Sequence, residues 1–240
     1  MTEHWLQPDW PALPGIEAVA SLRRGQDKAD PYAGFNLADH VGDLPERVMR
    51  NREALFRCWQ LPAEPVWLRQ VHGTDVVEGR GYAQPPCADA SFTEQAGVVL
   101  AVLTADCLPI LLRAEDGSAI SAVHAGWRGL LAGILARAVE RFAGRTVQAW
   151  LGPAISAKAF IVGDEVKTAA GFAQAFQPAV ESGKWHMDLY AIARGQLQAL
   201  GVTAIYGGQY CTFTEPERFY SYRRDAVTGR MATLIWKSLS

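Results

Sequence analysis

Residues 104–129 read T-A-D-C-L-P-I-L-L-R-A-E-D-G-S-A-I-S-A-V-H-A-G-W-R-G, and this stretch decides the fold at the centre of the chain. Two apolar runs, at residues 109–112 and 119–124, flank the dipeptide Asp116-Gly117. Asp-Gly between apolar runs is a strong signal for a two-residue hairpin turn. The stretch therefore predicts two antiparallel strands that pair with each other across this turn.

The hairpin also predicts which side chains share a face. If Glu115 pairs with Ser118, the register places Cys107 opposite Gly126 and diagonal to His124. Side chains alternate between the two faces of a strand, so Cys107 and His124 point to the same side. Diagonal neighbours have Cα atoms roughly 7–8 Å apart, which lets a thiolate and an imidazole reach one metal ion.

Strands and helices are also predicted outside the hairpin. Apolar runs rich in β-branched residues predict strands at residues 66–71, 98–103, 147–151 and 231–236. Apolar side chains recur at helical spacing over residues 128–142, which predicts one helix there, and two further helices are expected at 46–56 and 189–200. The strands neither alternate strictly with helices nor all pair in hairpins, so we expect a mixed α+β domain rather than a doubly wound one.

The composition favours small-molecule chemistry in a single domain. The chain has 240 residues, of which 49% are hydrophobic, enough for one large core. Lys and Arg number 23 against 25 Asp and Glu, so the chain lacks the basic excess that nucleic-acid and acidic-membrane partners require. The N-terminus lacks a signal-peptide pattern and the apolar runs are strand-sized, so we expect a cytoplasmic protein without a membrane span.

Four cysteines are scattered along the chain without a C-x-x-C pair: Cys58, Cys87, Cys107 and Cys211. A reducing compartment disfavours disulfides between them. Each cysteine is therefore expected to be buried, reactive or metal-bound.

Three residues form a candidate metal site. His72 ends the strand predicted at 66–71, and such a position lets a side chain project from a sheet edge into a site. With Cys107 and His124 it would supply three ligands of a tetrahedral zinc and leave the fourth position for water or substrate, as in catalytic zinc sites. Alternatively, His124 is a hydrogen-bonded core histidine and Cys107 a small buried hydrophobe. A structural zinc would need a fourth ligand, for which Cys211 is the candidate.

Charged residues near these ligands are candidates for the rest of the chemistry. Arg128 opens the predicted helix just after His124, so its guanidinium and the first free N–H groups would face an anion such as phosphate. The alternative for Arg128 is a solvated residue of the first turn. Asp89 and Asp106 are candidate proton carriers, although an Asp in a turn more often forms local hydrogen bonds.

The sequence contains no H-E-x-x-H, no G-x-S-x-G, no Walker loop and no zinc-deaminase signature, which disfavours those enzyme classes. Five blocks do resemble a known family. They are L-R-Q-V-H-G-T-D-V at 68–76, T-A-D-C-L-P at 104–109, H-A-G-W-R-G at 124–129, L-G-P-A-I at 151–155 and Y-S-Y-R-R-D at 220–225. The chain resembles the bacterial YfiH family, also called the multicopper polyphenol oxidase or laccase-domain family and described as purine nucleoside phosphorylases. The resemblance runs from about residue 19 to residue 236.

The resemblance implies one YfiH-like domain over residues 1–240, with mixed sheets flanked by helices in α/β/β/α layers. It carries the family's metal ligands onto His72, Cys107 and His124, with zinc as the expected metal and copper as the alternative. The substrate-binding residues that we expect in or near the blocks are Asn36, Gln70, Arg128, Tyr222, Arg223 and Arg224.

One segment departs from the family pattern. The family's T-R-x-G-G-V-S reads L-R-R-G-Q-D-K at residues 22–28, so a glycine and a hydroxyl are lost there. The region from residue 25 to 34 reads as a long loop. Residues 36–43 keep most of the family's N-L-G-x-H-V-G-D, in which Asn36 is either a ligand to the substrate or the cap of a turn.

The resemblance predicts a zinc enzyme whose partners are a purine nucleoside and phosphate. The expected reactions are phosphorolysis of adenosine, inosine, guanosine or methylthioadenosine, deamination of adenosine, or both. For deamination, zinc brings the pKa of a bound water to about 7 and so supplies hydroxide. For phosphorolysis, Arg128, Arg223 or Arg224 would orient phosphate at C1′, and Asp89 or Asp106 would protonate the leaving purine.

Two other functions compete with this one. The first is a metal-free hydrolase, for example of peptidoglycan precursors, in which Cys107 is the nucleophile and His124 or His72 its base. The second is copper-dependent oxidation of phenols. This second function is ranked last, because one His/Cys/His set provides too few copper centres and methionine is scarce around the motifs.

Overall fold

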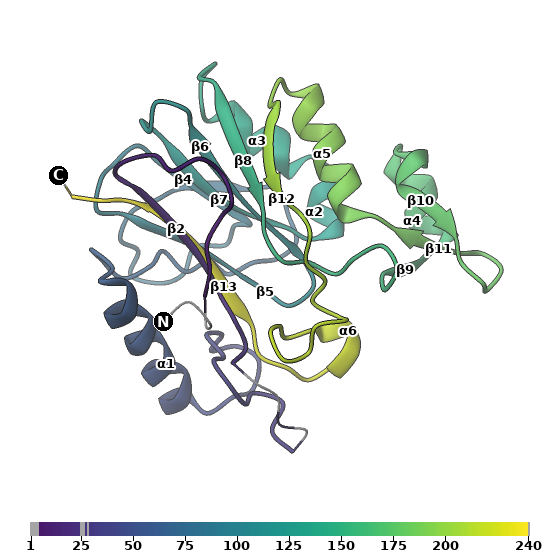
Figure 1. The fold of residues 1–240 in the computed structure, drawn as a ribbon, viewed down its shortest axis with the longest axis horizontal. Helices are drawn as coiled ribbons and strands as arrows, with labels where there is room; N and C mark the ends of the chain where they lie inside the picture. The colour runs from purple at the N-terminus through teal and green to yellow at the C-terminus, as the bar shows by residue number, and fades with distance from the viewer. Residues whose placement is uncertain (1–4, 25–26, 28, 240) are drawn as a thin grey trace.

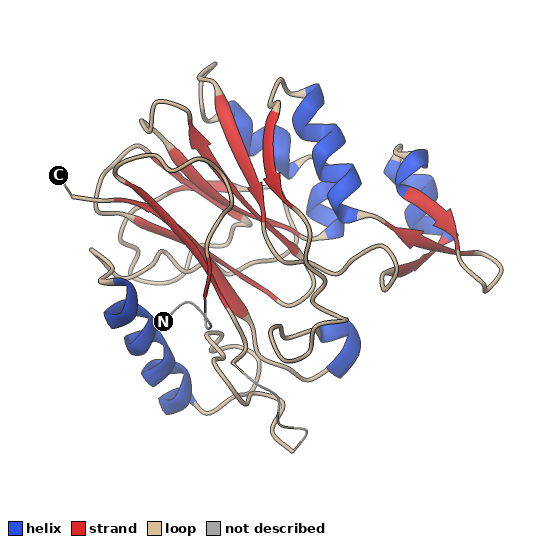
Figure 2. Cartoon of the chain, viewed as in Figure 1, coloured by secondary structure: helices blue, strands red, loops and turns tan. Residues whose placement is uncertain are grey.

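Two β-sheets lie face to face at the centre of the molecule, and helices cover their outer faces (Figures 1 and 2). This arrangement is seen in a computed structural model, which describes residues 5–24, 27 and 29–239. The layers follow the order α/β/β/α and the class is α+β, as expected. No helix in the described part of the chain is long and apolar enough to span a membrane.

The larger sheet has six strands in the order β12-β8-β6-β7-β4-β3. Their bounds are β3 (Val76–Glu78), β4 (Ala90–Thr93), β6 (Leu108–Ala114), β7 (Ile120–Ala125), β8 (Val147–Leu151) and β12 (Ala204–Gly207). The central pairs are antiparallel and the two outer pairs are parallel, so the sheet is mixed. Its outer face packs against α2 (Trp127–Ala132), α3 (Ile134–Glu140) and α5 (Leu189–Ala199) in one apolar cluster.

The smaller sheet is antiparallel, with the order β1-β2-β13-β5. Its strands are β1 (Trp5–Leu6), β2 (Ile16–Ser21), β5 (Val99–Thr104) and β13 (Met231–Lys237), and α1 (Pro45–Trp59) lies on its outer side. Strand β5 is buried on both faces. Leu100 and Val102 pack between the sheets. On the other face of the strand, Val99, Ala101 and Leu103 pack toward Leu55 of α1. Burial on both faces explains the continuous apolar run of this strand.

The remaining elements lie at one end of the molecule. A small antiparallel sheet protrudes there, beside α4 (Asp164–Ala170) and the 3₁₀ helix η2 (Ala173–Ala175) (Figure 1). Its strands are β9 (Ile161–Gly163), β10 (Phe176–Pro178) and β11 (Lys184–Met187). The short helix α6 (Tyr222–Asp225) precedes β13.

The central hairpin has the predicted register, because Pro109 pairs with His124 across β6 and β7. Its turn is longer than predicted. The last backbone pair is Ala114 with Ala119, so four residues rather than two form the turn. Gly117 takes the positive φ of 72°, and the Asp116 carboxylate caps the turn by accepting a hydrogen bond from the backbone N–H of Ser118.

Two other expectations need correction. The helix expected over residues 128–142 is divided into α2 and α3, because Gly133 has a φ of 95° that ends the first helix. The run at residues 66–71 forms isolated bridges instead of a strand. The reason is that the side-chain amide of Gln70, in place of backbone, bonds to both the N–H and the C=O of Leu103. The other predicted strands and helices form within a few residues of their expected bounds.

Candidate metal centre

Three side chains from separate segments meet at the end of the two sheets. His72 lies in the loop before β3, Cys107 joins β5 to β6, and His124 lies near the end of β7. Their ligand atoms all lie within 4.8 Å of one another. His72 is exposed, Cys107 is half-buried and His124 is buried, so the group opens to solvent on one side. The predicted set is therefore brought together, with room for a fourth ligand from outside the chain.

The spacing of the three side chains fits a tetrahedral metal. Zinc bonds of roughly 2.3 Å to sulfur and 2.0–2.1 Å to nitrogen, at a tetrahedral angle, imply a sulfur–nitrogen separation of about 3.6 Å. The distance from Sγ of Cys107 to Nε2 of His72 is 3.6 Å. Cys211, the candidate fourth ligand, lies elsewhere: its sulfur accepts a hydrogen bond from the N–H of Ser156. All four cysteines are free.

A glycine provides the space in which the three ligands meet. A Cβ on Gly126 would lie 2.5 Å from Cδ2 of His72 and 3.2 Å from Sγ of Cys107. Gly126 stands where the predicted register placed it, beyond the last pair of the hairpin and opposite Cys107. Three residues later, a Cβ on Gly129 would lie 2.6 Å from the carbonyl oxygen of Gly73. These close approaches explain the glycines of the block H-A-G-W-R-G.

Asp89 orients the histidines. Its Oδ1 accepts hydrogen bonds from Nδ1 of His124 at 2.7 Å and from the backbone N–H of His72 at 2.9 Å. Its Oδ2 accepts from the N–H groups of Val71 and Gly73. Because Nδ1 of His124 is occupied, Nε2 of this ring is the nitrogen left for a metal. His72 has a φ of 61°, and these backbone bonds hold it in that uncommon conformation.

The charges of the metal-free site are strongly coupled. Burial raises the pKa of the Cys107 thiol, but the charge of His124 and hydrogen bonds from both histidines bring it down to about 6. Burial lowers the pKa of His124, but the Cys107 thiolate and the Asp89 carboxylate raise it to about 9. Burial also raises the pKa of Asp89, and the hydrogen bonds from His124 and Gly73 outweigh this and leave it below its usual value. Asp89 is thus an ionised acceptor.

Asp106 supports the turn that carries Cys107. Its Oδ1 accepts a hydrogen bond from Oγ1 of Thr212 at 2.6 Å, and its Oδ2 accepts from the backbone N–H of Arg223 at 2.7 Å. The residue is buried and has a φ of 94°, which L-amino acids rarely adopt. Through these two hydrogen bonds the carboxylate links α6 and the loop that contains Thr212 to the turn before Cys107.

Asn36 also has its side chain bonded within the protein. Its amide nitrogen donates to the carbonyl oxygen of Ala38 and to Oδ2 of Asp43. Its amide oxygen accepts from the backbone N–H groups of Ala38 and Arg230. The residue is fully buried, so in this structure it acts as a turn cap that links residues 36–43 to the start of β13.

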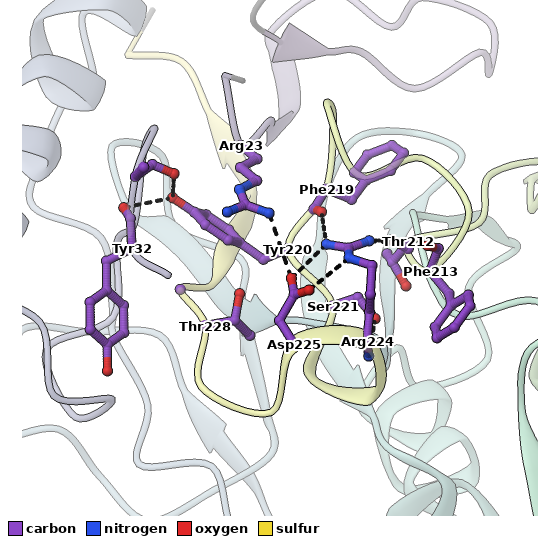
Figure 3. A network of polar contacts seen from close by, with 12 residues as sticks. Arg23, Tyr32, Thr212, Phe213, Phe219, Tyr220, Ser221, Arg224, Asp225 and Thr228 are labelled. Atoms are coloured by element: carbon purple, nitrogen blue, oxygen red, sulfur yellow. Dashed lines mark hydrogen bonds and ion pairs between the residues drawn. The ribbon is translucent and has the colours of Figure 1, made fainter. Parts of the chain in front are cut away.

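Arg224 stands at the centre of a polar network around α6 (Figure 3). Its Nε and Nη2 donate to the carboxylate of Asp225. The rest of its N–H groups donate to the carbonyl oxygens of Thr212, Phe213 and Phe219. All five N–H donors of Arg224 are thus used. Arg23, which is almost fully buried, approaches the same Asp225 carboxylate at 3.6 Å.

The remaining predicted ligands keep free polar groups. Arg128 is exposed at the start of α2, with its guanidinium 4.3 Å from the ring centre of Trp127. Tyr222 and Arg223 are exposed on α6, and one nitrogen of Arg223 donates to the carbonyl oxygen of Ile161. The hydrogen bond from the Arg223 backbone to Asp106 places α6 beside the Cys107 turn.

Sequence reasoning missed Arg230, which lies beside the same turn. Met231, the first residue of β13, pairs with Thr104 at the end of β5, so the preceding Arg230 lies beside the segment that leads to Cys107. The sequence does predict strands at residues 231–236 and 98–103. Pairing these two strands would have placed Arg230 close to Cys107. Gly25, Gln26 and Lys28, in the segment that departs from the family pattern and in the expected loop, lie outside the described residues.

Comparisons with known proteins identify the family of the chain. A family model described as multi-copper polyphenol oxidoreductase laccase matches residues 17–238. The chain is 48% identical over 236 residues to the purine nucleoside phosphorylase YfiH of Escherichia coli, with 95% of this chain and 97% of the relative covered. It is 44% identical to a purine nucleoside phosphorylase of Pseudomonas aeruginosa, with 97% and 98% covered.

Solved structures show the same fold. A crystal structure of a Neisseria meningitidis protein superposes with a TM-score of 0.90 at 43% identity, and covers 99% of this chain and 100% of its own. YlmD from Geobacillus stearothermophilus superposes with a TM-score of 0.89 at 30% identity, over 100% and 98% of the two chains. These matches confirm the resemblance seen in the five sequence blocks, and the chain belongs to the family described as multi-copper polyphenol oxidoreductase laccase, which it shares with relatives named YfiH.

Proposed function

We propose that this chain is a zinc-dependent purine nucleoside phosphorylase that acts on adenosine, inosine, guanosine and methylthioadenosine. The observation that carries the proposal is the set of His72, Cys107 and His124, oriented by Asp89 and open on one side. The names of the relatives from Escherichia coli and Pseudomonas aeruginosa support the reaction class. Two imidazoles and one thiolate suit zinc well, and copper is the alternative metal for this donor set.

In phosphorolysis a phosphate oxygen attacks C1′ of the nucleoside as the bond from C1′ to N9 breaks. The electron pair of that bond leaves with the purine, which takes up a proton, and the second product is the sugar 1-phosphate, which is ribose 1-phosphate for adenosine, inosine and guanosine. The chain must hold phosphate close to C1′ and stabilise the charge that develops on the purine. The candidates for these contacts are Arg128 and Tyr222, whose side chains form no hydrogen bond within the described residues, and Arg223, which uses one nitrogen to bond to Ile161. A bound zinc would supply positive charge that polarises an oxygen of the substrate or a water molecule.

Asp89 and Asp106 have supporting roles in this proposal rather than proton transfer. Each carboxylate accepts hydrogen bonds on both oxygens from groups of the protein. The low pKa of Asp89 keeps it ionised at neutral pH, so it has no proton to give. Deamination of adenosine at the same site, with water adding to C6 and ammonia leaving, would use the same open position of the metal.

A metal-free cysteine hydrolase is the second candidate. A specific observation favours it: the Cys107 thiol has its pKa lowered to about 6 and lies 3.6 Å from Nε2 of His72. A thiolate paired with an imidazole is the arrangement of cysteine nucleophiles. The two candidates predict different responses to alkylation, because a metal-bound thiolate is protected whereas a free nucleophile is not.

The test combines metal analysis with product analysis. We expect one zinc per chain, and formation of ribose 1-phosphate that depends on added phosphate. Cys107→Ser should lose both the metal and the activity, whereas Cys87→Ser, an exposed cysteine outside the cluster, should retain both. Iodoacetamide should alkylate Cys107, and so prevent added zinc from restoring activity, only after a chelator has removed the metal. Hydrolysis that needs neither metal nor phosphate, together with inactivation by iodoacetamide alone, would instead identify a cysteine hydrolase.

A further inference from the structure

Arg230 differs from the other buried or half-buried arginines beside α6. Arg23 and Arg224 both approach the carboxylate of Asp225. Arg230 is half-buried, yet within the described residues no carboxylate oxygen lies within 4.0 Å of its guanidinium. A half-buried cation without an anionic partner is costly, because burial removes part of its hydration. The position is therefore open to an anionic partner from outside the chain.

The backbone of Arg230 is held rigidly. Its N–H donates to Oδ1 of Asn36 at 2.9 Å, and its carbonyl oxygen accepts from the N–H of Leu37. Asn36 is fully buried and both atoms of its side-chain amide are bonded, so the side chain cannot move without breaking this link. Asn36 therefore positions Arg230. This role explains why Asn36 belongs to the family's N-L-G-x-H-V-G-D pattern although its side chain does not face the site.

The side chain is fixed along one edge only. Nη1 of Arg230 donates to the carbonyl oxygens of Thr228 at 2.8 Å and Gly229 at 3.0 Å. Among the described residues, no acceptor bonds to Nε or Nη2. These two nitrogens form the edge of a guanidinium that binds two oxygens of one phosphate or carboxylate in parallel. The ring centre of Tyr222 lies 5.9 Å from the guanidinium carbon.

Strand pairing places Arg230 near the candidate site, because the next residue, Met231, pairs with Thr104, three residues before Cys107. Burial lowers the pKa of Arg230, and the negative charges of Cys107 and Asp106 act on it in the opposite direction. The thiolate would be neutralised by a metal, and Asp106 is already bonded to Thr212 and to the backbone of Arg223. The charge of Arg230 therefore remains available to an anion next to the metal ligands.

We propose that Arg230 binds the oxyanion of the co-substrate, inorganic phosphate, through Nε and Nη2. The inference deepens the proposed function and rests on it for the identity of the anion. Arg230 is thereby a substrate-binding residue, and Asn36 is the residue that positions it. A planar guanidinium held in place offers two parallel hydrogen bonds, which a lysine at the same position cannot.

The test measures phosphate binding separately from turnover. Inorganic phosphate is titrated calorimetrically into metal-loaded protein without nucleoside, for the wild type, Arg230→Gln and Arg230→Lys. Two charge-assisted hydrogen bonds are lost in Arg230→Gln, so we expect phosphate affinity to fall by at least about tenfold. Arg230→Lys should lie between the two. In turnover, the KM for phosphate should rise by a similar factor while the KM for inosine changes little.

Controls keep a failure of folding apart from a failure of the inference. Arg137→Gln makes the same change on an exposed face of α3 and should bind phosphate like the wild type. Zinc content and melting temperature are measured for every variant, and Arg230→Lys provides a second variant if Arg230→Gln does not fold. Phosphate affinity unchanged in a folded, zinc-loaded Arg230→Gln would overturn the assignment. Phosphate binding that depends on Arg230 in a protein that forms no ribose 1-phosphate would keep the anion site and overturn the phosphorylase proposal.

Discussion

The carboxylate of Asp89 accepts a 2.7 Å hydrogen bond from Nδ1 of His124, and the same oxygen accepts from the backbone of His72. One buried side chain thus sets the orientation of a ring on β7 and the conformation of the loop that carries the other histidine. A carboxylate behind a ligating histidine fixes the tautomer of the ring and increases its basicity. The metal ligands therefore depend on a residue that does not touch the metal position.

We predict that Asp89→Asn weakens zinc binding about 10- to 100-fold, the range typical of such supporting residues. An amide has only one accepting oxygen, so two of the four N–H donors around this side chain would lose their acceptor. The fold should also be destabilised, by about 2–3 kcal/mol. Competition with a chelator of known affinity measures the first effect, and denaturant unfolding of the metal-free protein measures the second.

Asp188→Asn is the matched control for this change. Asp188 caps α5 by accepting a hydrogen bond from the N–H of Ala191, and Asn caps helices as well as Asp does. Its zinc affinity and its stability should both stay close to those of the wild type. Zinc affinity within twofold of the wild type in Asp89→Asn would show that the imidazole of His124 is oriented by other contacts.

Gly126→Ala should remove the metal while leaving most of the fold intact. The added Cβ would come within 2.5 Å of the His72 ring, which lies in an exposed loop and can move away. That movement separates His72 from the other two ligands, so we expect zinc content to fall well below one per chain. Gly81→Ala adds the same methyl group where no atom lies within 4 Å, and should keep its zinc. Full zinc occupancy in Gly126→Ala would mean that the close packing of glycine against the ring is not required.

The sequence predicted for a local reason that the candidate ligands Cys107 and His124 lie together. Cys107 and His124 are brought together by a single hairpin, and its turn residues and the alternation of strands determine the register within that hairpin. His72 was placed correctly at the site although the strand expected before it does not form. Its position depends on hydrogen bonds from residues 71–73 to Asp89, which are long-range contacts.

The roles of buried polar residues were not predictable in the same way. Asn36, Gln70, Asp106 and Arg224 all stand in or beside family blocks, and the sequence shows their type without showing their partners. In the structure Gln70 and Asp106 bond to groups that lie far along the chain, and Asn36 bonds to the distant backbone N–H of Arg230 as well as to its own loop. Arg224 bonds to carbonyl oxygens of the segment just before α6, which the sequence does not show either. Whether such residues bind the substrate remains a prediction, which direct binding measurements on each variant can test. Arg230 was overlooked because its position depends on the pairing of β13 with β5.

Zinc binding should release one proton per site at neutral pH. The pKa of Cys107 is lowered to about 6 and that of His124 raised to about 9, so between these values the metal-free site holds a thiolate and an imidazolium. A metal requires the neutral imidazole, so binding displaces the proton of His124. The apparent Kd for zinc should therefore fall about tenfold for each unit of rising pH in this window.

Chelator competition at several pH values between those two limits measures the slope. Cys107→Ser is the informative comparison, because it removes the thiolate charge that raises the pKa of His124. Because this variant is expected to lose zinc, the comparison is made on metal-free protein by NMR titration of the His124 imidazole, whose pKa should be lower than in the wild type. A zinc affinity independent of pH in the wild type would show that the imidazole of His124 is already neutral before the metal arrives.

The positive φ of Asp106 should be visible as a difference between two substitutions that both remove the carboxylate. Asp106→Gly and Asp106→Ala lose the same hydrogen bonds to Thr212 and Arg223. Only alanine must then hold a Cβ at a φ of 94°, which costs roughly 1–2 kcal/mol. Glycine gains entropy in the unfolded chain, which offsets about 0.4–1 kcal/mol of that difference. Alanine should therefore be the less stable variant by about 1 kcal/mol in denaturant unfolding. Equal stability would mean that the turn relaxes around residue 106, and that Cys107 reaches its place without the uncommon backbone conformation.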